Sequence, residues 1–183
     1  MIKFITGNKT KYLEAKKIVP NLGLIHLNLP ENQELDFKAV VKSKLKEAFK
    51  HHKGPFLVED SGLSLEALNW QLPGPLIKWF NITIGGMGIY QIAKGLKKFK
   101  AEAVTMLAFA TSPKKIEFFI GKIRGKVVSP RGGYKFGYDE IFVPNGSIQT
   151  LSEMKAAGDF SSSPRGLAFR AFKEYLKGLK HNY

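Results

Sequence analysis

The 183-residue sequence has no cysteine, which excludes disulfide bonds and thiolate metal ligands. This fits a reducing compartment, and we expect a cytoplasmic protein because the chain begins directly with an apolar strand and no signal-peptide pattern. No apolar run reaches the roughly 18 residues that span a bilayer, so we expect no membrane partner.

Acidic residues are also scarce, with 15 Asp and Glu against 29 Lys and Arg and a net charge of +14. Such an excess favours anionic partners, either nucleotides or nucleic acid. The lysines are spread through predicted helices and do not alternate with aromatic residues as in an RNA-binding signature. Nucleic acid is therefore possible but not favoured, and a lysine-rich solvated surface explains the charge equally well.

The pattern of apolar residues predicts one α/β domain over residues 1–183. Glycine and proline in 62–75 predict a loop, and the glycines of 85–88 a break before a helix near 89–97. We expect an elongated mixed β-sheet flanked by helices, with a long hairpin extending it into a second lobe and a central cleft. The predicted strands are 1–5, 24–29, 56–58, 101–111, 115–123 and 141–143, and the main helices are 12–19, 37–49 and the segment after 163.

A small polar turn follows the first predicted strand and opens the first helix. It contains Thr6, Gly7 and Asn8, with Lys11 one helical turn further on. A glycine allows close backbone approach, and free N–H groups at a helix N-terminus bind phosphate. The turn therefore predicts a phosphate cradle, although an asparagine-capped helix without a ligand gives the same pattern.

Two adjacent carboxylates, Glu59 and Asp60, follow the short apolar strand 56–58 and precede Gly62. We expect them at the carboxyl end of that strand, where α/β proteins build their sites. Adjacent side chains of an extended segment point to opposite sides, so both can hold one ion only if the strand has already ended. We favour Asp60 for chemistry, and together the two segments predict metal-assisted hydrolysis of a nucleotide phosphate.

Several segments, in order, resemble the Ham1-like inosine triphosphate pyrophosphatase family. They are 6–8 with Lys11 and Glu14, 29–31, 58–63, 72–75 with 77–80, 130–132, and 136–139 with Phe142 and Pro144. The resemblance covers almost the whole chain. It implies a two-lobed homodimer that uses Mg²⁺ to hydrolyse ITP, dITP or XTP to the monophosphate and pyrophosphate.

The resemblance also implies roles for individual residues. Asp60 would be the catalytic base or water-orienting group, and Glu31 and Asp60 the metal ligands. The substrate-binding residues would be Thr6, Gly7, Asn8, Lys11, Lys44, Ser61, Phe136, Asp139 and Arg165.

Less specific interpretations remain for some of these residues. Glu31 could be a loop carboxylate, Lys44 a solvated lysine, and Phe136 part of a tight aromatic turn in the core. Trp79 and Phe80 are more typical of a core than of a site.

Two positions depart from the family pattern near the last helix. Pro164 stands where the family has histidine, and Asp159 stands where it has a lysine that helps recognise the 6-oxo group of the base. Glu140 also replaces a proline. Because Pro164 has no donor and Asp159 reverses the charge, we expect weaker discrimination between ITP and ATP. The alternatives are a catalytically weak nucleotide- or RNA-binding relative and a hydrolase for other damaged nucleotides.

Overall fold

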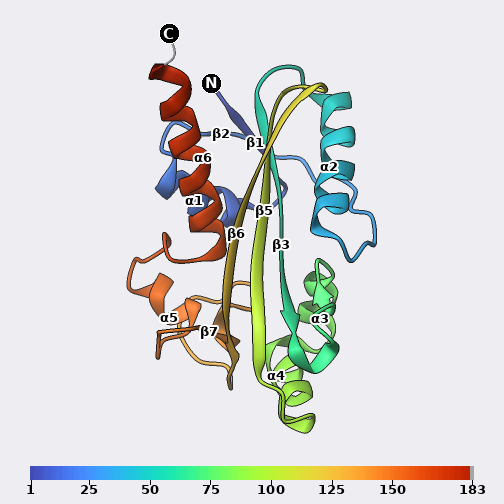
Figure 1. The fold of residues 1–183 in the computed structure, drawn as a ribbon, viewed down its shortest axis with the longest axis vertical. Coiled ribbons are helices and arrows are strands. Elements are labelled where there is room, and N and C mark those ends of the chain that lie inside the picture. The colour runs from blue at the N-terminus through green and yellow to red at the C-terminus, as the bar shows by residue number, and fades with distance from the viewer. Residues whose placement is uncertain (182–183) are drawn as a thin grey trace.

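The computed structural model describes residues 1–181, which form a long open sheet with helices against both faces (Figure 1). The strands are β1 (Lys3–Ile5), β2 (Gly23–Ile25), β3 (Phe56–Leu65), β4 (Pro73–Gly74), β5 (Lys100–Ser112), β6 (Lys115–Val127) and β7 (Phe142–Pro144). The helices are α1 (Lys9–Ile18), α2 (Phe37–His51), α3 (Ile77–Thr83), α4 (Gly85–Gly95), α5 (Leu151–Ala156) and α6 (Pro164–His181), with short 3₁₀ turns η1 (Glu66–Leu68) and η2 (Asp139–Ile141).

The seven-stranded sheet is mixed. Its order is β2-β1-β3-β5-β6-β7, with β4 attached beside β3. The β1 strand pairs in parallel with β2 and β3, whereas the β3–β5, β5–β6 and β6–β7 pairs are antiparallel. Three long strands, β3, β5 and β6, run along the length of the molecule and join its two ends (Figure 1). The predicted fold class is therefore confirmed.

Three groups of buried apolar residues hold the helices to this sheet. Near the termini, α2 packs on one face around Val41 and Phe56, and α1 and α6 pack on the other around Phe4 and Phe169. A third group, around Ile89, joins α3, α4 and β7 at the opposite end. The apolar spacing of α2 and α6 gives each helix one buried stripe, which explains why both were predicted.

Three local predictions were wrong. The β3 strand does not end at residue 58 but continues to Leu65 and then pairs with β4, so much of the predicted loop is sheet. Gly62 lies inside this strand, and glycine is required there because a Cβ would lie 2.1 Å from the backbone oxygen of Gly74 in β4. The glycines of 85–88 begin α4 instead of preceding it, and a Cβ on Gly86 would lie 2.7 Å from the Glu140 carboxylate.

The short helix α5 was not predicted, although the sequence contains its signal. Thr150 and Glu153 form a capping box, each accepting a hydrogen bond from the other's backbone N–H. Within residues 1–181, no helix is both long and apolar enough to cross a bilayer.

Candidate active site

A cleft of about 970 Å³ lies between the two ends of the molecule. Its walls are formed by the N-terminus of α1, the middle of β3, the start of α3, the η2 turn and the start of α6. All eleven predicted site residues line it: Thr6, Gly7, Asn8, Lys11, Glu31, Lys44, Asp60, Ser61, Phe136, Asp139 and Arg165.

The two adjacent carboxylates lie in the middle of β3, not at a strand end as predicted. Glu59 and Asp60 therefore point to opposite sides of the sheet. Both are 4% exposed. Asp60 meets Lys44 from α2, and Glu59 meets Arg165 from α6. The two carboxylates thus belong to separate clusters.

The first cluster contains two carboxylates joined by one lysine. Lys44 Nζ lies 2.6 Å from Asp60 Oδ1 and 2.7 Å from Glu31 Oε1. Lys44 is 5% exposed, which excludes the solvated-lysine interpretation. Burial opposes the charge on Lys44, but Asp60 and Glu31 outweigh burial and raise its pKa.

Asp60 has one unsatisfied oxygen. Its Oδ2 atom is buried and has no hydrogen-bond partner within the described part of the chain. Burial raises the pKa of Asp60 although Lys44 and Lys11 oppose the shift. A buried carboxylate oxygen without a partner is costly. Asp60 lines the cleft, and an unpartnered carboxylate oxygen is a group that accepts a hydrogen bond from water or binds a cation.

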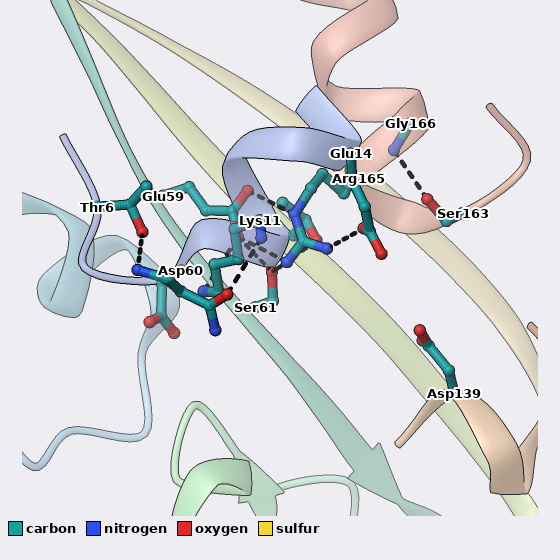
Figure 2. A network of polar contacts seen from close by, with 12 residues as sticks. Thr6, Lys11, Glu14, Glu59, Asp60, Ser61, Asp139, Ser163, Arg165 and Gly166 are labelled. Carbon is teal, nitrogen blue, oxygen red and sulfur yellow. Dashed lines mark hydrogen bonds and ion pairs between the residues drawn. The ribbon is translucent and has the colours of Figure 1, made fainter. Parts of the chain in front are cut away.

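The second cluster is built around Arg165 (Figure 2). Its guanidinium donates to both oxygens of Glu59, at 2.9 and 2.8 Å, and to Glu14 Oε2. Lys11 Nζ lies 3.1 Å from Glu59 Oε1, so Lys11 is held inside the cleft. Burial alone would raise the pKa of Glu59, but Arg165 and Lys11 hold it far below the ordinary carboxyl range. Glu59 is thus a permanently charged anchor, unsuited to be a base.

The N-terminus of α1 faces the same cleft. Asn8 caps it by accepting a hydrogen bond from Lys11 N, and Asn8 N donates to Thr6 Oγ1. A Cβ on Gly7 would fall 1.5 Å from Asn28 Oδ1, which explains the need for glycine. The cap and the phosphate-cradle interpretations coexist, since one turn does both.

The other end of the cleft carries Phe136 and Asp139. Figure 2 places Asp139 apart from the Arg165 network. Lys155 Nζ, from α5, lies 2.6 Å from Asp139 Oδ2 and 2.9 Å from Glu14 Oε1. Both Lys155 and Arg165 lie within 6 Å of the Phe136 ring centroid. Burial raises the pKa of Asp139 to about 6, despite the opposing effect of Lys155.

Sequence reasoning missed two residues of this network. Lys155 had no signal of its own, and Glu14 was only part of the motif, although it accepts hydrogen bonds from Lys155, Arg165 and Tyr134. Trp79 was predicted in the core, but it is 48% exposed and lines the cleft, whereas Phe80 packs against the core as predicted.

Asp159 does not line the cleft. Its Oδ1 atom accepts hydrogen bonds from Ser161 and Ser162 in the turn before α6. Pro164 does line the cleft, as the first residue of α6. The Asp159 carboxylate therefore stabilises this turn and does not contribute to the wall of the cleft.

The comparisons with known proteins place this chain in a family. The Ham1 family model matches residues 2–175. An inosine triphosphate pyrophosphatase from Schizosaccharomyces pombe is 38% identical over 98% of this chain and 97% of its own length. A dITP/XTP pyrophosphatase from Methanopyrus kandleri is 34% identical over 96% of each chain. The chain therefore belongs to the Ham1 family.

Solved structures agree on the fold. A HAM1 protein from Coxiella burnetii has a TM-score of 0.83 over 97% of this chain and all of that one, at 21% identity. A dITP/XTP pyrophosphatase from Mycobacterium abscessus has a TM-score of 0.68 and 27% identity, over 94% and 98% of the two chains.

Proposed function

We propose that this protein hydrolyses 6-oxo purine nucleoside triphosphates, such as ITP, dITP and XTP, to the monophosphate and pyrophosphate. This would make it a hydrolase of acid anhydrides that removes damaged nucleotides. The observation that carries the proposal is Asp60, which lines the cleft together with Lys11 and Lys44 and has a buried oxygen without a hydrogen-bond partner among residues 1–181.

The half of the cleft formed by the α1 N-terminus, Lys11 and Lys44, here called the phosphate half, suits a triphosphate. The α1 N-terminus offers backbone N–H groups and a partial positive charge, and Lys11 and Lys44 add two full charges. In phosphoryl transfer, catalysis consists largely of positioning and charge neutralisation. We assign Asp60 to orient the attacking water and accept its proton, because Asp60 lines the cleft and its Oδ2 atom has no hydrogen-bond partner among residues 1–181.

We further propose that Glu31 and Asp60 would hold Mg²⁺ together with phosphate oxygens. Among residues 1–181, no three Asp, Glu, His or Cys side chains gather into a metal site. Two carboxylates nevertheless fit, since Mg²⁺ is commonly held by one or two carboxylates, water and substrate phosphates. The unpartnered Asp60 Oδ2 supports this assignment. When bound, Mg²⁺ supplies positive charge that offsets the phosphate charge.

The base half would hold the purine against Phe136. An aromatic ring stacks on any purine, so selection among purines requires polar groups at the base edge. Asp139 and Arg165 lie within reach of this ring, although Arg165 already gives most of its donors to Glu59, Glu14 and Ser61.

We also propose a single two-lobed domain that acts as a cytoplasmic homodimer. Exposed apolar side chains at the start of α4, Ile84 and Met87, support a contact between copies. Light scattering of the purified protein tests the oligomeric state.

The experiment that tests the proposed reaction is product analysis. Purified protein is incubated with ITP and Mg²⁺, and the products are separated by anion-exchange chromatography. The proposal predicts IMP and pyrophosphate in equal amounts, and loss of both when Mg²⁺ is chelated. IDP and inorganic phosphate, or no products, would contradict it and leave the nucleotide-binding alternative.

A further inference from the structure

The base half of the cleft contains a lysine that the motif comparison does not reveal. Lys155 is 4% exposed, yet it lines the cleft beside Phe136 and Asp139. It is contributed by α5 and precedes the motif position of Asp159 by four residues. The positive charge that is absent from position 159 is thus supplied to the cleft by Lys155 of α5.

Lys155 has one unused donor. An ammonium group carries three N–H donors, and the contacts of the described residues account for two of them, to Glu14 and Asp139. Tyr134 and Arg165 also donate to Glu14, which fixes the position of the carboxylate that orients Lys155. The remaining donor belongs to a rigid, buried ammonium at the wall of the cleft.

Asp139 offers the complementary group. Its Oδ2 atom accepts from Lys155, and among residues 1–181 no hydrogen bond reaches its Oδ1 atom. Asp139 Oδ1 is also not among the buried unpartnered atoms of this region, and Asp139 lines the cleft. Lys155 and Asp139 therefore present a donor and an acceptor side by side, next to an aromatic ring.

We infer that Lys155 and Asp139 together select 6-oxo purines, with Lys155 donating to O6 and Asp139 accepting from N1–H. This rests on the proposed function. A 6-oxo purine presents an acceptor at O6 beside a donor at N1, and adenine presents the reverse order at N6 and N1. Adenine would therefore leave the third donor of Lys155 and Asp139 Oδ1 unpaired, and unpaired buried polar groups are a strong basis for rejection.

The inference makes a distinction that a structural role for Lys155 does not. Guanine carries the same O6 and N1–H as hypoxanthine, so Lys155 would not separate ITP from GTP. Loss of the lysine should lower kcat/KM for ITP and GTP together, and should leave ATP unchanged or improved. A lysine that only joined Glu14 to Asp139 would affect all three nucleotides in parallel.

The test compares kcat/KM for ITP, GTP and ATP in the parent protein, Lys155→Met and Lys135→Met. Lys135 is exposed on the loop beside Phe136 and does not line the cleft, so its variant makes the same charge change outside the site. We expect Lys155→Met to lower the ITP/ATP ratio by about tenfold or more, as for loss of a hydrogen bond to a charged group. The ITP/GTP ratio should stay within twofold, and Lys135→Met should change neither ratio.

A second variant covers the possibility that Lys155→Met does not fold. Lys155→Gln keeps a shorter, uncharged donor and should lower the ITP/ATP ratio by about threefold or more. Thermal unfolding establishes which variants are folded. An ITP/ATP ratio equal to the parent's in either folded variant overturns the inference. A parent that releases no pyrophosphate from ITP instead overturns the proposed function.

Discussion

The two halves of the cleft differ in how their charges are arranged. In the phosphate half, Lys11 and Lys44 each pair with carboxylates from β3 and leave the α1 N-terminus open. In the base half, Lys155 is enclosed by Glu14 and Asp139. The first half holds two lysines paired with three carboxylates beside a helix N-terminus, whereas the second holds a fixed pattern of donors and acceptors. Under the proposed function, the first half would contribute to binding the phosphates and the second to selecting the base.

Glu14 and Glu59 connect the two halves. Arg165 binds both carboxylates, Glu59 also binds Lys11, and Glu14 also binds Lys155. A change on one side of Arg165 therefore reaches the other through two hydrogen-bonded carboxylates. The predictions below separate the anchor, the chemistry, the phosphate charge and the turn before α6.

The largest effect is expected for Glu59→Gln. It leaves Arg165 and Lys11 with less negative charge in a buried site, and should lower the free energy of unfolding by about 3–5 kcal/mol. Denaturant unfolding measures this loss, with Glu117→Gln, on the exposed side of β6, as the control. A loss below about 1 kcal/mol, typical of a surface ion pair, would show that Glu59 is no anchor.

The same variant should change the response to acid. The pKa of Glu59 and of Glu14 is lowered from 4.5 in the folded protein, so their contribution is present above that pH and is lost as pH falls below it. Asp139 acts in the opposite sense, because its pKa is raised from 3.8 to about 6 and its contribution is lost as pH rises through 6. Unfolding curves between pH 3 and 7 should therefore show a shallower acid limb in Glu59→Gln than in the parent.

Asp60→Asn should be the next largest change. Loss of the proton acceptor should lower kcat for ITP by about 10² or more, with little change in KM. Asp36→Asn is the matched control, because Asp36 caps α2 outside the cleft and asparagine caps equally well. Turnover by Asp60→Asn at the parent rate would remove Asp60 from the chemistry.

Lys11→Ala should act mainly on binding. Removing one positive charge at the α1 N-terminus should raise KM for ITP by about tenfold. Because Lys11 is paired with the buried Glu59, a modest loss of stability should accompany this change. Lys16→Ala, on the exposed side of the same helix, controls for net charge. Equal KM values in the two variants would contradict the assignment.

The smallest effect is expected for Asp159→Lys. The family resemblance predicts that Pro164→His and Asp159→Lys together sharpen selectivity, but Asp159 accepts hydrogen bonds in the turn before α6 and does not line the cleft. We therefore expect an ITP/ATP ratio within twofold of the parent, with a small decrease in thermal stability. A clear gain in selectivity would place position 159 back in the base half.

Much of the phosphate half could be predicted because its signals are local. The turn at 6–8 lies between a strand and a helix, and Glu59 and Asp60 are adjacent in the sequence. The length of β3 could not be predicted, because Gly62 is typical of a turn in the sequence. In the fold, this glycine lies within the strand because β4 approaches it too closely for a side chain. The role of Lys155 could not be predicted for a similar reason. Its partner Glu14 lies 141 positions away, so only the packing of α1 against the rest of the fold brings them together.

We expect this cleft to select a 6-oxo purine over adenine, although Pro164 and Asp159 depart from the family pattern. The most direct measurement is a competition, with equal concentrations of ITP and ATP in one reaction with Mg²⁺ and the parent protein. The relative rates of disappearance give the ratio of kcat/KM values without separate kinetic constants. We predict that ITP is converted to IMP about tenfold faster or more, while ATP remains. Loss of both nucleotides at the same rate would contradict the claim.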